Sequence, residues 1–407
     1  MTISTRISEL YEVSEERQRL LSMEGLRGFA VLLVFFVHFD ALFGSYVVRY
    51  PFFKGISNFM GDIGNTGVDL FFVLSGYLIY GALLRKKVSF LKFIRRRVER
   101  IYPTFLAVFA LYLILSAFFR SENKIHGSVL SASLYVLQNA LLLPGIFNIT
   151  PIITVAWSLS YEFFFYLLIP IVVWITRMRA WKAGFRVAFF VALWLFYILY
   201  AFTVPRSQVR LLMFVGGILL YEAIGSAWLR DRLTRKGEIL AICVFLASLA
   251  FVYLCDARQG WFSFLPGMTA GRTILPGVPT YQGPYKVIAL TISCPMLALY
   301  SFEFEGVLKA IFSWNPMRYL GNMSYSYYLI HGLSLHVVAL IAYSIAPPVA
   351  PSLWIFLLSL PVGFAATWIA STLLFMFIEK PLSLQRRPAP KLQVEPPAAQ
   401  PYLAPPR

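Results

Sequence analysis

The stretch LRGFAVLLVFFVHFD, from Leu26 to Asp40, decides the fold class of this chain. It is apolar enough to form most of a membrane-spanning helix, which needs about 20 mostly apolar residues. It nevertheless holds three ionisable side chains, Arg27, His38 and Asp40. Ionisable groups are costly inside a bilayer and are usually functional there. The stretch therefore predicts a membrane-spanning helix that carries part of a functional site.

The composition of the whole chain agrees with a membrane protein. Of its 407 residues, 59% are hydrophobic and 14% are charged, whereas a soluble domain has about 25% charged residues. The first 22 residues are polar, so the first apolar run is interpreted as an uncleaved span and not as a signal peptide. The three cysteines show no metal or redox spacing, and neither a metal nor a bound cofactor is expected.

Ten segments are predicted to span the membrane, which makes the chain an all-α, polytopic transmembrane helix bundle. They are residues 25–43, 66–84, 103–119, 155–175, 187–204, 209–225, 238–254, 285–302, 323–345 and 353–377. An even number of spans puts both termini on one side. With the termini inside, most of the 36 Lys and Arg residues fall in inside segments, so both termini are predicted to be cytoplasmic.

The net charge of +17 could suggest a nucleic-acid partner. The basic residues lie in short segments between apolar runs, the pattern that orients membrane proteins, so nucleic acid is not expected. The predicted domains are a cytoplasmic segment 1–22, an integral-membrane domain 23–382 and a disordered, Pro-rich cytoplasmic tail 383–407. Segment 130–144 is predicted to be interfacial or re-entrant. The outer loop 255–283 is either a lid over a site or an irregular connector.

Arg27 and His38 are 11 residues apart in the first span. At about 100° and about 1.5 Å per residue they leave the same helix face, roughly 16 Å apart along the axis. One face thus joins a cation near the cytoplasmic end to an imidazole deeper in the membrane. A snorkelling Arg and a structural His remain the alternative.

Two carboxylates are predicted at the depth of His38. Asp69 lies near the outer end of the second span, and Glu162 lies inside the fourth. A carboxylate on the second imidazole nitrogen would fix the tautomer of His38 and raise its basicity, and this role is predicted for Asp69. The alternatives are a helix-capping Asp69 and a Glu162 that pairs with an Arg.

The stretch KKVSFLKFIRRRVERIYP is more basic than orientation alone requires. Arg96 and Arg100 share a helix face, and Arg97 is adjacent. Such a cluster suits a di- or triphosphate, since guanidinium groups bind phosphate through two hydrogen bonds. Binding of anionic lipids is the alternative. Glu379, at the end of the last span, is a candidate partner for one of these arginines.

The ninth span carries a dense set of hydroxyl groups and a second histidine at mid-membrane depth. These residues either line a path for a sugar or polyol or hydrogen-bond between helices. The candidates for the substrate path are Ser324, Tyr325, Tyr328 and His331.

Several blocks, in order, resemble the membrane acyltransferase-3 family of integral-membrane O-acyltransferases. The first is EGLRGFAVLLVFFVHF, with the Arg and His of that family's first span at the same spacing. The others are GVDLFFVLSGYLI, FIRRRVERIYP, WSLSYEFFFYLLIP, LGNMSYSYYLIHG and FIEKPL. Together they extend from about Met23 to Pro381.

This resemblance implies an O-acetyltransferase of the cytoplasmic (inner) membrane. Its donor would be cytoplasmic acyl-coenzyme A, and its acceptor a hydroxyl of a surface polysaccharide, lipid-linked saccharide or similar molecule. His38 would be the general base or acyl carrier, with Asp69 and Glu162 as its supports, and Arg27, Arg96, Arg97 and Arg100 would hold the donor. A proton-coupled transporter or flippase remains the alternative, because buried His, Asp and Glu also suit a proton relay.

Overall fold

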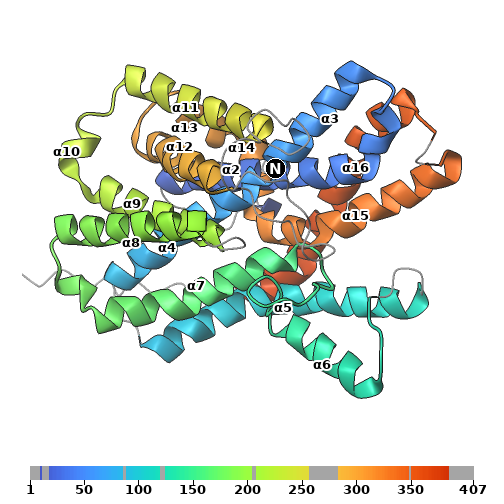
Figure 1. The fold of residues 1–407 in the computed structure, drawn as a ribbon, viewed down its shortest axis with the longest axis horizontal. Helices are drawn as coiled ribbons and strands as arrows, with labels where there is room; N and C mark the ends of the chain where they lie inside the picture. The colour runs from blue at the N-terminus through green and yellow to red at the C-terminus, as the bar shows by residue number, and fades with distance from the viewer. Residues whose placement is uncertain are drawn as a thin grey trace, which may run out of the picture.

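The computed structural model describes residues 10–11, 18–85, 89–119, 124–203, 208–255, 283–347 and 350–384. These ranges form helices and connecting segments, without a β-strand (Figure 1). Within them, nine helices are long and apolar enough to cross a membrane. The predicted all-α membrane bundle is confirmed. Residues 256–282 of the predicted outer loop and 385–407 of the predicted tail lie outside the described part of the chain.

Nine of the ten predicted spans coincide with long apolar helices. They are α2 (Gln18–Phe43), α4 (Thr66–Arg85), α5 (Phe90–Phe118), α7 (Ala156–Ile175), α8 (Ala183–Thr203), α11 (Arg235–Leu254), α12 (Pro284–Glu303), α15 (Ser324–Ile345) and α16 (Leu353–Leu374), which continues as the π-helical segment η5 (Phe375–Leu384). Helix α5 begins 13 residues before the predicted span at 103. The arginine-rich stretch therefore continues the same helix, because Arg, Leu and Phe do not interrupt it.

The remaining predicted span, residues 209–225, the sixth along the chain, is a shorter element than expected. It consists of a 3₁₀ turn, η4 (Val209–Leu211), and the 14-residue helix α9 (Leu212–Gly225). Fourteen residues extend about 21 Å, less than the ~30 Å of a hydrocarbon core. Helix α9 packs against α4, α8 and α12 and buries most of its side chains. Because protein surrounds it, α9 does not have to match the thickness of the lipid.

Several shorter helices connect the long ones. Helix α3 (Pro51–Gly64) follows the 3₁₀ turn η1 (Gly44–Val47) and packs against α2 and α11. Helix α6 (Val129–Ala140) lies within the predicted interfacial segment and exposes apolar side chains such as Leu130 and Leu134. Its placement in the membrane stays a prediction. The remaining connectors are η3 (Met178–Ala180), α10 (Ala227–Arg230), α13 (Val307–Phe312) and α14 (Asn315–Asn322).

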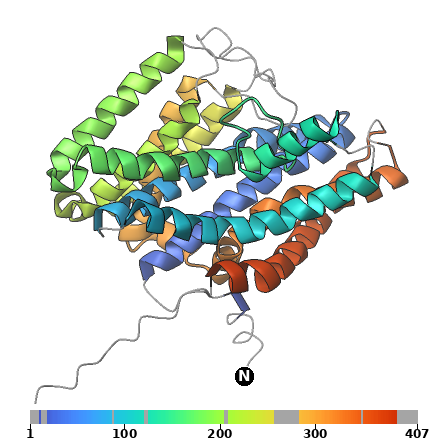
Figure 2. The ribbon, with the colours of Figure 1, turned by 90° about the horizontal axis from the view of Figure 1, so that it is seen from below.

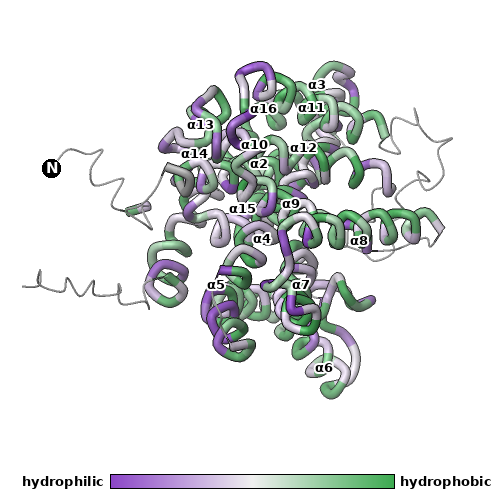
Figure 3. Tube along the Cα trace, turned by 90° about the vertical axis from the view of Figure 1, so that its left-hand side faces the viewer, coloured by the Kyte–Doolittle hydropathy of each residue, from purple (hydrophilic) through white to green (hydrophobic). Residues whose placement is uncertain are grey.

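Helix α2 lies at the centre of the bundle. It packs against α14, α3, α4 and α15, while α4 packs against α9, and α15 against α16 (Figure 1). Figure 2 shows α5 running along the outside of this arrangement. In Figure 3, hydrophilic residues are prominent on the near parts of α5 and on α13 and α14, whereas α8 is almost wholly hydrophobic. The first span is thus the element against which much of the bundle is assembled.

Helices α4 and α9 approach each other through small residues. A Cβ atom on Gly76 would lie 2.2 Å from the carbonyl oxygen of Phe214, and one on Gly217 would lie 2.0 Å from that of Val73. Both contacts are with backbone, which cannot move aside without shifting a helix. Small residues that let backbones approach closely favour helix association in a bilayer, where van der Waals packing is one of the driving forces.

Buried polar contacts join α4 and α9 at two levels. Asp69 at the start of α4 pairs with Arg210 just before α9, at 3.3 Å. Eleven residues further along α4, the Tyr80 hydroxyl donates to Glu222 near the end of α9, at 2.8 Å. The two helices therefore run antiparallel over this length. Although α9 is short, it carries the chain from one level of the bundle to the other.

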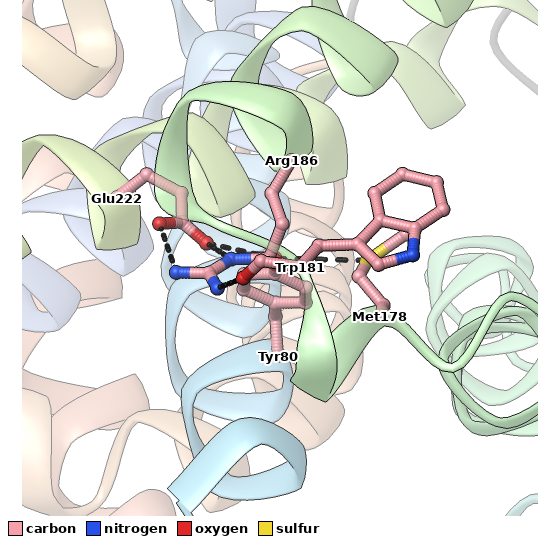
Figure 4. A network of polar contacts seen from close by, with 5 residues as sticks. All are labelled: Tyr80, Met178, Trp181, Arg186 and Glu222. Carbon is pink, nitrogen blue, oxygen red and sulfur yellow. Dashed lines mark hydrogen bonds and ion pairs between the residues drawn. The ribbon is translucent and has the colours of Figure 1, made fainter.

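Glu222 is the centre of the polar network drawn in Figure 4. Arg186 of α8 donates to both of its carboxylate oxygens, at 2.6 and 2.8 Å, and to the carbonyl oxygen of Trp181 at 2.6 Å. Tyr80 contacts both Glu222 and the sulfur of Met178. The network connects α4, α8, α9 and the segment after α7. Both charges and the hydroxyl are satisfied, which buried polar groups require.

The Gly217→Ala variant should lower the thermal midpoint of the protein in detergent, because the added methyl group overlaps the Val73 carbonyl. Overpacking of this kind costs about 1–3 kcal/mol. The matched control is Gly55→Ala in α3, where a Cβ meets nothing within 4 Å. A midpoint for Gly217→Ala equal to or above that of Gly55→Ala would contradict the close contact.

The Glu222→Gln variant should lower the thermal midpoint further, because it leaves the Arg186 guanidinium partly buried without its counter-charge. Breaking a buried ion pair costs about 3–5 kcal/mol. Arg95→Gln, which removes the exposed Arg95–Glu99 pair, is the control and should change the free energy of unfolding by less than about 1 kcal/mol. Equal midpoints for the two variants would show that the network does not stabilise the bundle.

Candidate active site

Five helices, from α2 near the amino terminus to α15 about 300 residues later, converge on one cavity of about 110 Å³. Its wall is apolar on the side of α4 and polar where α2, α5, α7 and α15 meet. The polar lining residues are Arg27 of α2, Ser75 of α4, Arg97 and Arg100 of α5, Ser158, Glu162 and Tyr166 of α7, and Ser324, Tyr325 and Tyr328 of α15. The apolar lining residues include Val68, Phe71, Phe72, Leu74 and Ile79.

Three of the four arginines predicted to hold the donor line this cavity. Arg27 donates from Nε and Nη2 to the Ser324 hydroxyl, at 3.1 and 2.8 Å. Arg97 lies over the rings of Phe93 and Tyr166, at 5.2 and 5.5 Å. Arg100 also lines the cavity, and among the described residues it forms no ion pair or hydrogen bond. Arg96 is exposed and does not line the cavity.

Glu162 is the carboxylate of the cavity wall. It accepts short hydrogen bonds from the hydroxyl groups of Ser75 and Tyr166. Three guanidinium groups line the cavity with one carboxylate, and the nearby Glu379 carboxylate interacts with two of these arginines, which leaves a formal surplus of one positive charge. A partly buried surplus of this kind favours an anionic ligand, because charges interact more strongly there than in water.

Glu379 lies beside this wall in the π-helical segment η5. Its carboxylate accepts hydrogen bonds from the backbone N–H and the hydroxyl of Ser326, at 3.0 and 2.6 Å. Arg100 and Arg27 are the cations that interact with it. Instead of forming a direct ion pair with the basic stretch, Glu379 holds the first turn of α15, where acidic groups stabilise a helix.

His38 and His331 form a pair beyond the cavity. The Nε2 atom of His331 lies 3.2 Å from Nδ1 of His38, and the two rings are nearly perpendicular with centroids 4.6 Å apart. His331 is fully buried, whereas His38 is half-buried. The Nδ1 atom of His38 also lies 2.9 Å from the carbonyl oxygen of Val34. The Nε2 atom of His38 forms no contact of this kind with any residue the structure describes.

Tyr328 connects the cavity to the histidine pair. It lines the cavity, and its ring centroid lies 5.8 Å from that of His331. Its hydroxyl is hydrogen-bonded to the Ser158 hydroxyl at 2.7 Å and to the Val155 carbonyl oxygen at 3.1 Å. Of the residues predicted for the substrate path, Ser324, Tyr325 and Tyr328 therefore line the cavity. The fourth, His331, contacts His38 instead.

Asp69 is placed away from the role predicted for it. It forms its ion pair with Arg210, whose guanidinium group lies over the Trp157 ring at 5.2 Å. The polar contacts of His38 are with Val34 and His331, and Asp69 is not among them. Glu162 likewise contacts Ser75 and Tyr166 rather than His38. The neighbour of the imidazole is thus a second imidazole and not a carboxylate.

The sequence contained one signal for this pair. The sequence predicts both His38 and His331 well inside the membrane, in the first and ninth predicted spans, which should run in the same direction. The contacts Arg27–Ser324 and His38–His331 follow the same order along α2 and α15, so the two helices are indeed parallel. No sequence feature indicated that these two spans would be neighbours.

The comparisons with known proteins agree with this architecture. The family model described as an acyltransferase domain, that of the acyltransferase-3 family, matches residues 20–373. The chain therefore belongs to this family of multi-pass membrane proteins. No solved structure matches the chain.

Three curated relatives show what the chain is similar to. It is 25% identical to the peptidoglycan O-acetyltransferase OatA of Listeria monocytogenes, over 90% of this chain and 56% of that protein. It is 25% identical to the putative peptidoglycan O-acetyltransferase YrhL of Bacillus subtilis, over 92% and 57%. It is 26% identical to the exopolysaccharide production protein ExoZ of Rhizobium meliloti, over 79% and 90%. The chain thus spans a little over half the length of the first two.

Proposed function

We propose that the protein is a membrane O-acetyltransferase that moves an acetyl group from acetyl-coenzyme A to a hydroxyl of a cell-surface polysaccharide or its lipid-linked precursor. The observation that carries this proposal is the arrangement along α2 and α15. These two helices place an arginine-lined cavity, through Arg27 and Ser324, and a histidine pair, through His38 and His331, at successive levels of the bundle. In this proposal the anionic donor binds at the cavity, and the base, His38, lies further along the same two helices.

The positive wall of the cavity is the proposed site for the donor phosphates. Arg27, Arg97 and Arg100 lie on it, and guanidinium groups bind phosphate oxygens in pairs. The acyl-bearing arm of the donor would then extend past Tyr328 towards His38. This proposal leaves Arg96 outside the site, because its side chain is exposed.

The proposed chemistry uses the free Nε2 atom of His38. As a general base it takes the proton of the acceptor hydroxyl while the oxygen attacks the thioester carbonyl; a C–O bond forms, the C–S bond breaks, and the thiol leaves with the proton. Alternatively, Nε2 itself attacks the carbonyl: a C–N bond forms, the C–S bond breaks, and coenzyme A leaves as the thiolate. The acceptor hydroxyl then attacks the acyl-imidazolium, a C–O bond forms as the C–N bond breaks, and the hydroxyl proton passes to the thiolate, which restores the neutral imidazole. Both routes need Nε2 unprotonated and accessible at the start.

The orientation is proposed on electrostatic grounds. Placing the basic amino-terminal part of α5 in the cytoplasm puts the arginine cavity on the side from which coenzyme A is supplied. Both termini are then cytoplasmic, in a cell's cytoplasmic membrane. The histidine pair lies deeper, towards the side on which surface polysaccharide is assembled. Glu162 and Asp69 support this site by holding Tyr166 and Arg210, respectively.

The direct test uses the purified full chain in lipid nanodiscs. Radiolabelled acetyl-coenzyme A is supplied with candidate saccharide acceptors, and products are analysed by mass spectrometry. Transfer of single acetyl units to a saccharide hydroxyl is expected. Movement of a saccharide across vesicles without a donor, and without acetylation, would instead favour a transporter.

The His38→Ala variant should lower kcat/KM by about 10²–10⁴-fold, the usual contribution of a general base. Its amount in the membrane should stay near the wild-type value, whereas its thermal midpoint should fall modestly, because the buried Nε2 atom of His331 loses its partner at a cost of about 1–3 kcal/mol. The nanodisc assay measures the rate. Undiminished transfer by this variant would refute the assignment of His38.

The Arg100→Gln variant should raise the KM for acetyl-coenzyme A by about 10–100-fold, because a hydrogen bond to a charged group contributes about 1.5–3 kcal/mol. The value of kcat should change little, since Arg100 is not among the polar contacts of His38. Arg95→Gln, on the exposed side of the same helix, is the matched control and should leave KM near the wild-type value. Equal KM values for the two variants would place the donor elsewhere.

A further inference from the structure

The contacts of the two histidines determine where their protons lie. The Nδ1 atom of His331 is 2.8 Å from the carbonyl oxygen of Tyr328 and 3.2 Å from that of Tyr327. A carbonyl oxygen can only accept a hydrogen bond, so this nitrogen carries the proton. In the neutral ring the Nε2 atom of His331 is therefore an acceptor, and it faces Nδ1 of His38.

The same reasoning applies to His38. Its Nδ1 atom lies 2.9 Å from the Val34 carbonyl oxygen and 3.2 Å from Nε2 of His331. Both neighbours accept, so Nδ1 of His38 carries a proton shared between them, and Nε2 is left with its lone pair. The opposite assignment would turn lone pairs towards three carbonyl oxygens at 2.8 to 3.2 Å. Only one arrangement of protons makes every contact attractive.

We propose that His331 is the positioning residue of the reaction and stabilises the positively charged form of His38. This inference rests on the proposed function. When Nε2 of His38 takes the proton of the acceptor hydroxyl, or the acyl group, the ring becomes cationic. Its Nδ1–H then becomes a stronger donor, and the hydrogen bond to Nε2 of His331 becomes charge-assisted and stronger. This additional stabilisation exists only while His38 is positively charged during the reaction, and only an interaction that is stronger in the transition state than in the ground state accelerates a chemical step.

A neutral partner suits this position. In hydrolytic triads a carboxylate holds the base in its tautomer and stabilises the imidazolium. A carboxylate that is fully buried here would itself need a counter-charge in the resting state. His331, with 0% of its surface exposed, avoids that cost, because its own Nδ1–H is satisfied by the first turns of α15. The carboxylates Asp69 and Glu162 are held by other partners.

Two substitutions of His331 separate its two nitrogen atoms. The amide of Gln reaches the position of Nε2 and can present an oxygen to His38. The amide of Asn reaches only the position of Nδ1, so it keeps a donor for the Tyr328 carbonyl oxygen but loses His38. His331→Asn should lower kcat by about 10–100-fold, the loss expected for a hydrogen bond to a charged group, with the KM for acetyl-coenzyme A unchanged. His331→Gln should retain kcat within about tenfold of wild type.

The outcomes distinguish this inference from the proposed function. If His38→Ala is inactive while His331→Asn keeps the wild-type kcat, the role of His331 is overturned and the proposed function stands. If Asn and Gln lose activity equally, His331 acts only by its shape. Should wild type transfer no acetyl group, the proposed function itself fails.

A measurement on the unmodified protein keeps the inference testable even if these variants fail to fold. Imidazole ¹⁵N chemical shifts of histidine-labelled protein in nanodiscs report the tautomer of each ring. His38 and His331 should both be neutral and protonated at Nδ1, with a coupling or cross-peak that connects the two rings. A His331 protonated at Nε2 would overturn the proposal.

Discussion

The parallel contact between α2 and α15 is the arrangement on which the candidate site depends. Each ionisable side chain on this face of α2 meets a polar partner on α15: Arg27 meets Ser324, and His38 meets His331. A guanidinium or imidazole group in a bilayer is tolerated when protein groups satisfy it. The spacing on α2 therefore requires α15 beside it, and α15 in turn brings Tyr325 and Tyr328 to the cavity.

The antiparallel pair α4 and α9 supports this arrangement from the other side. Gly76 and Gly217 allow the two backbones to touch. The buried Asp69–Arg210 ion pair closes the contact at one end, and the Tyr80–Glu222 hydrogen bond closes it at the other. Removing Arg210 or Glu222 would leave a buried polar group without its partner, so these contacts specify which helices are neighbours as much as they stabilise them. Helix α4 is thereby held with Ser75 and Phe71 facing the cavity.

The cavity combines residues with different restraints. Arg27 donates hydrogen bonds to Ser324, and Arg97 lies over two aromatic rings. Among the described residues Arg100 interacts with Glu379 but forms no hydrogen bond or ion pair with it. This gradation is consistent with a site that is mostly preformed but still needs an anion. Arg96 is equally basic and adjacent in sequence, yet it does not line the cavity. Successive residues of a helix point about 100° apart, so the side chain of Arg96 points outwards from α5.

The sequence alone was sufficient to predict the membrane bundle, because the length of an apolar run shows whether it can span a bilayer. It was also sufficient to place Arg27 and His38 on one helix face, because helical periodicity is a local property. It also marked Glu162, Arg97, Arg100 and the hydroxyl groups of the ninth span. Only the tertiary structure decided that His331 is the neighbour of His38, that Asp69 belongs to Arg210, and that α9 can be short because protein covers it. Those outcomes depend on which helices pack together. In a bundle of similarly apolar spans, the neighbours of each helix are determined by glycine contacts and buried polar pairs between residues more than a hundred positions apart.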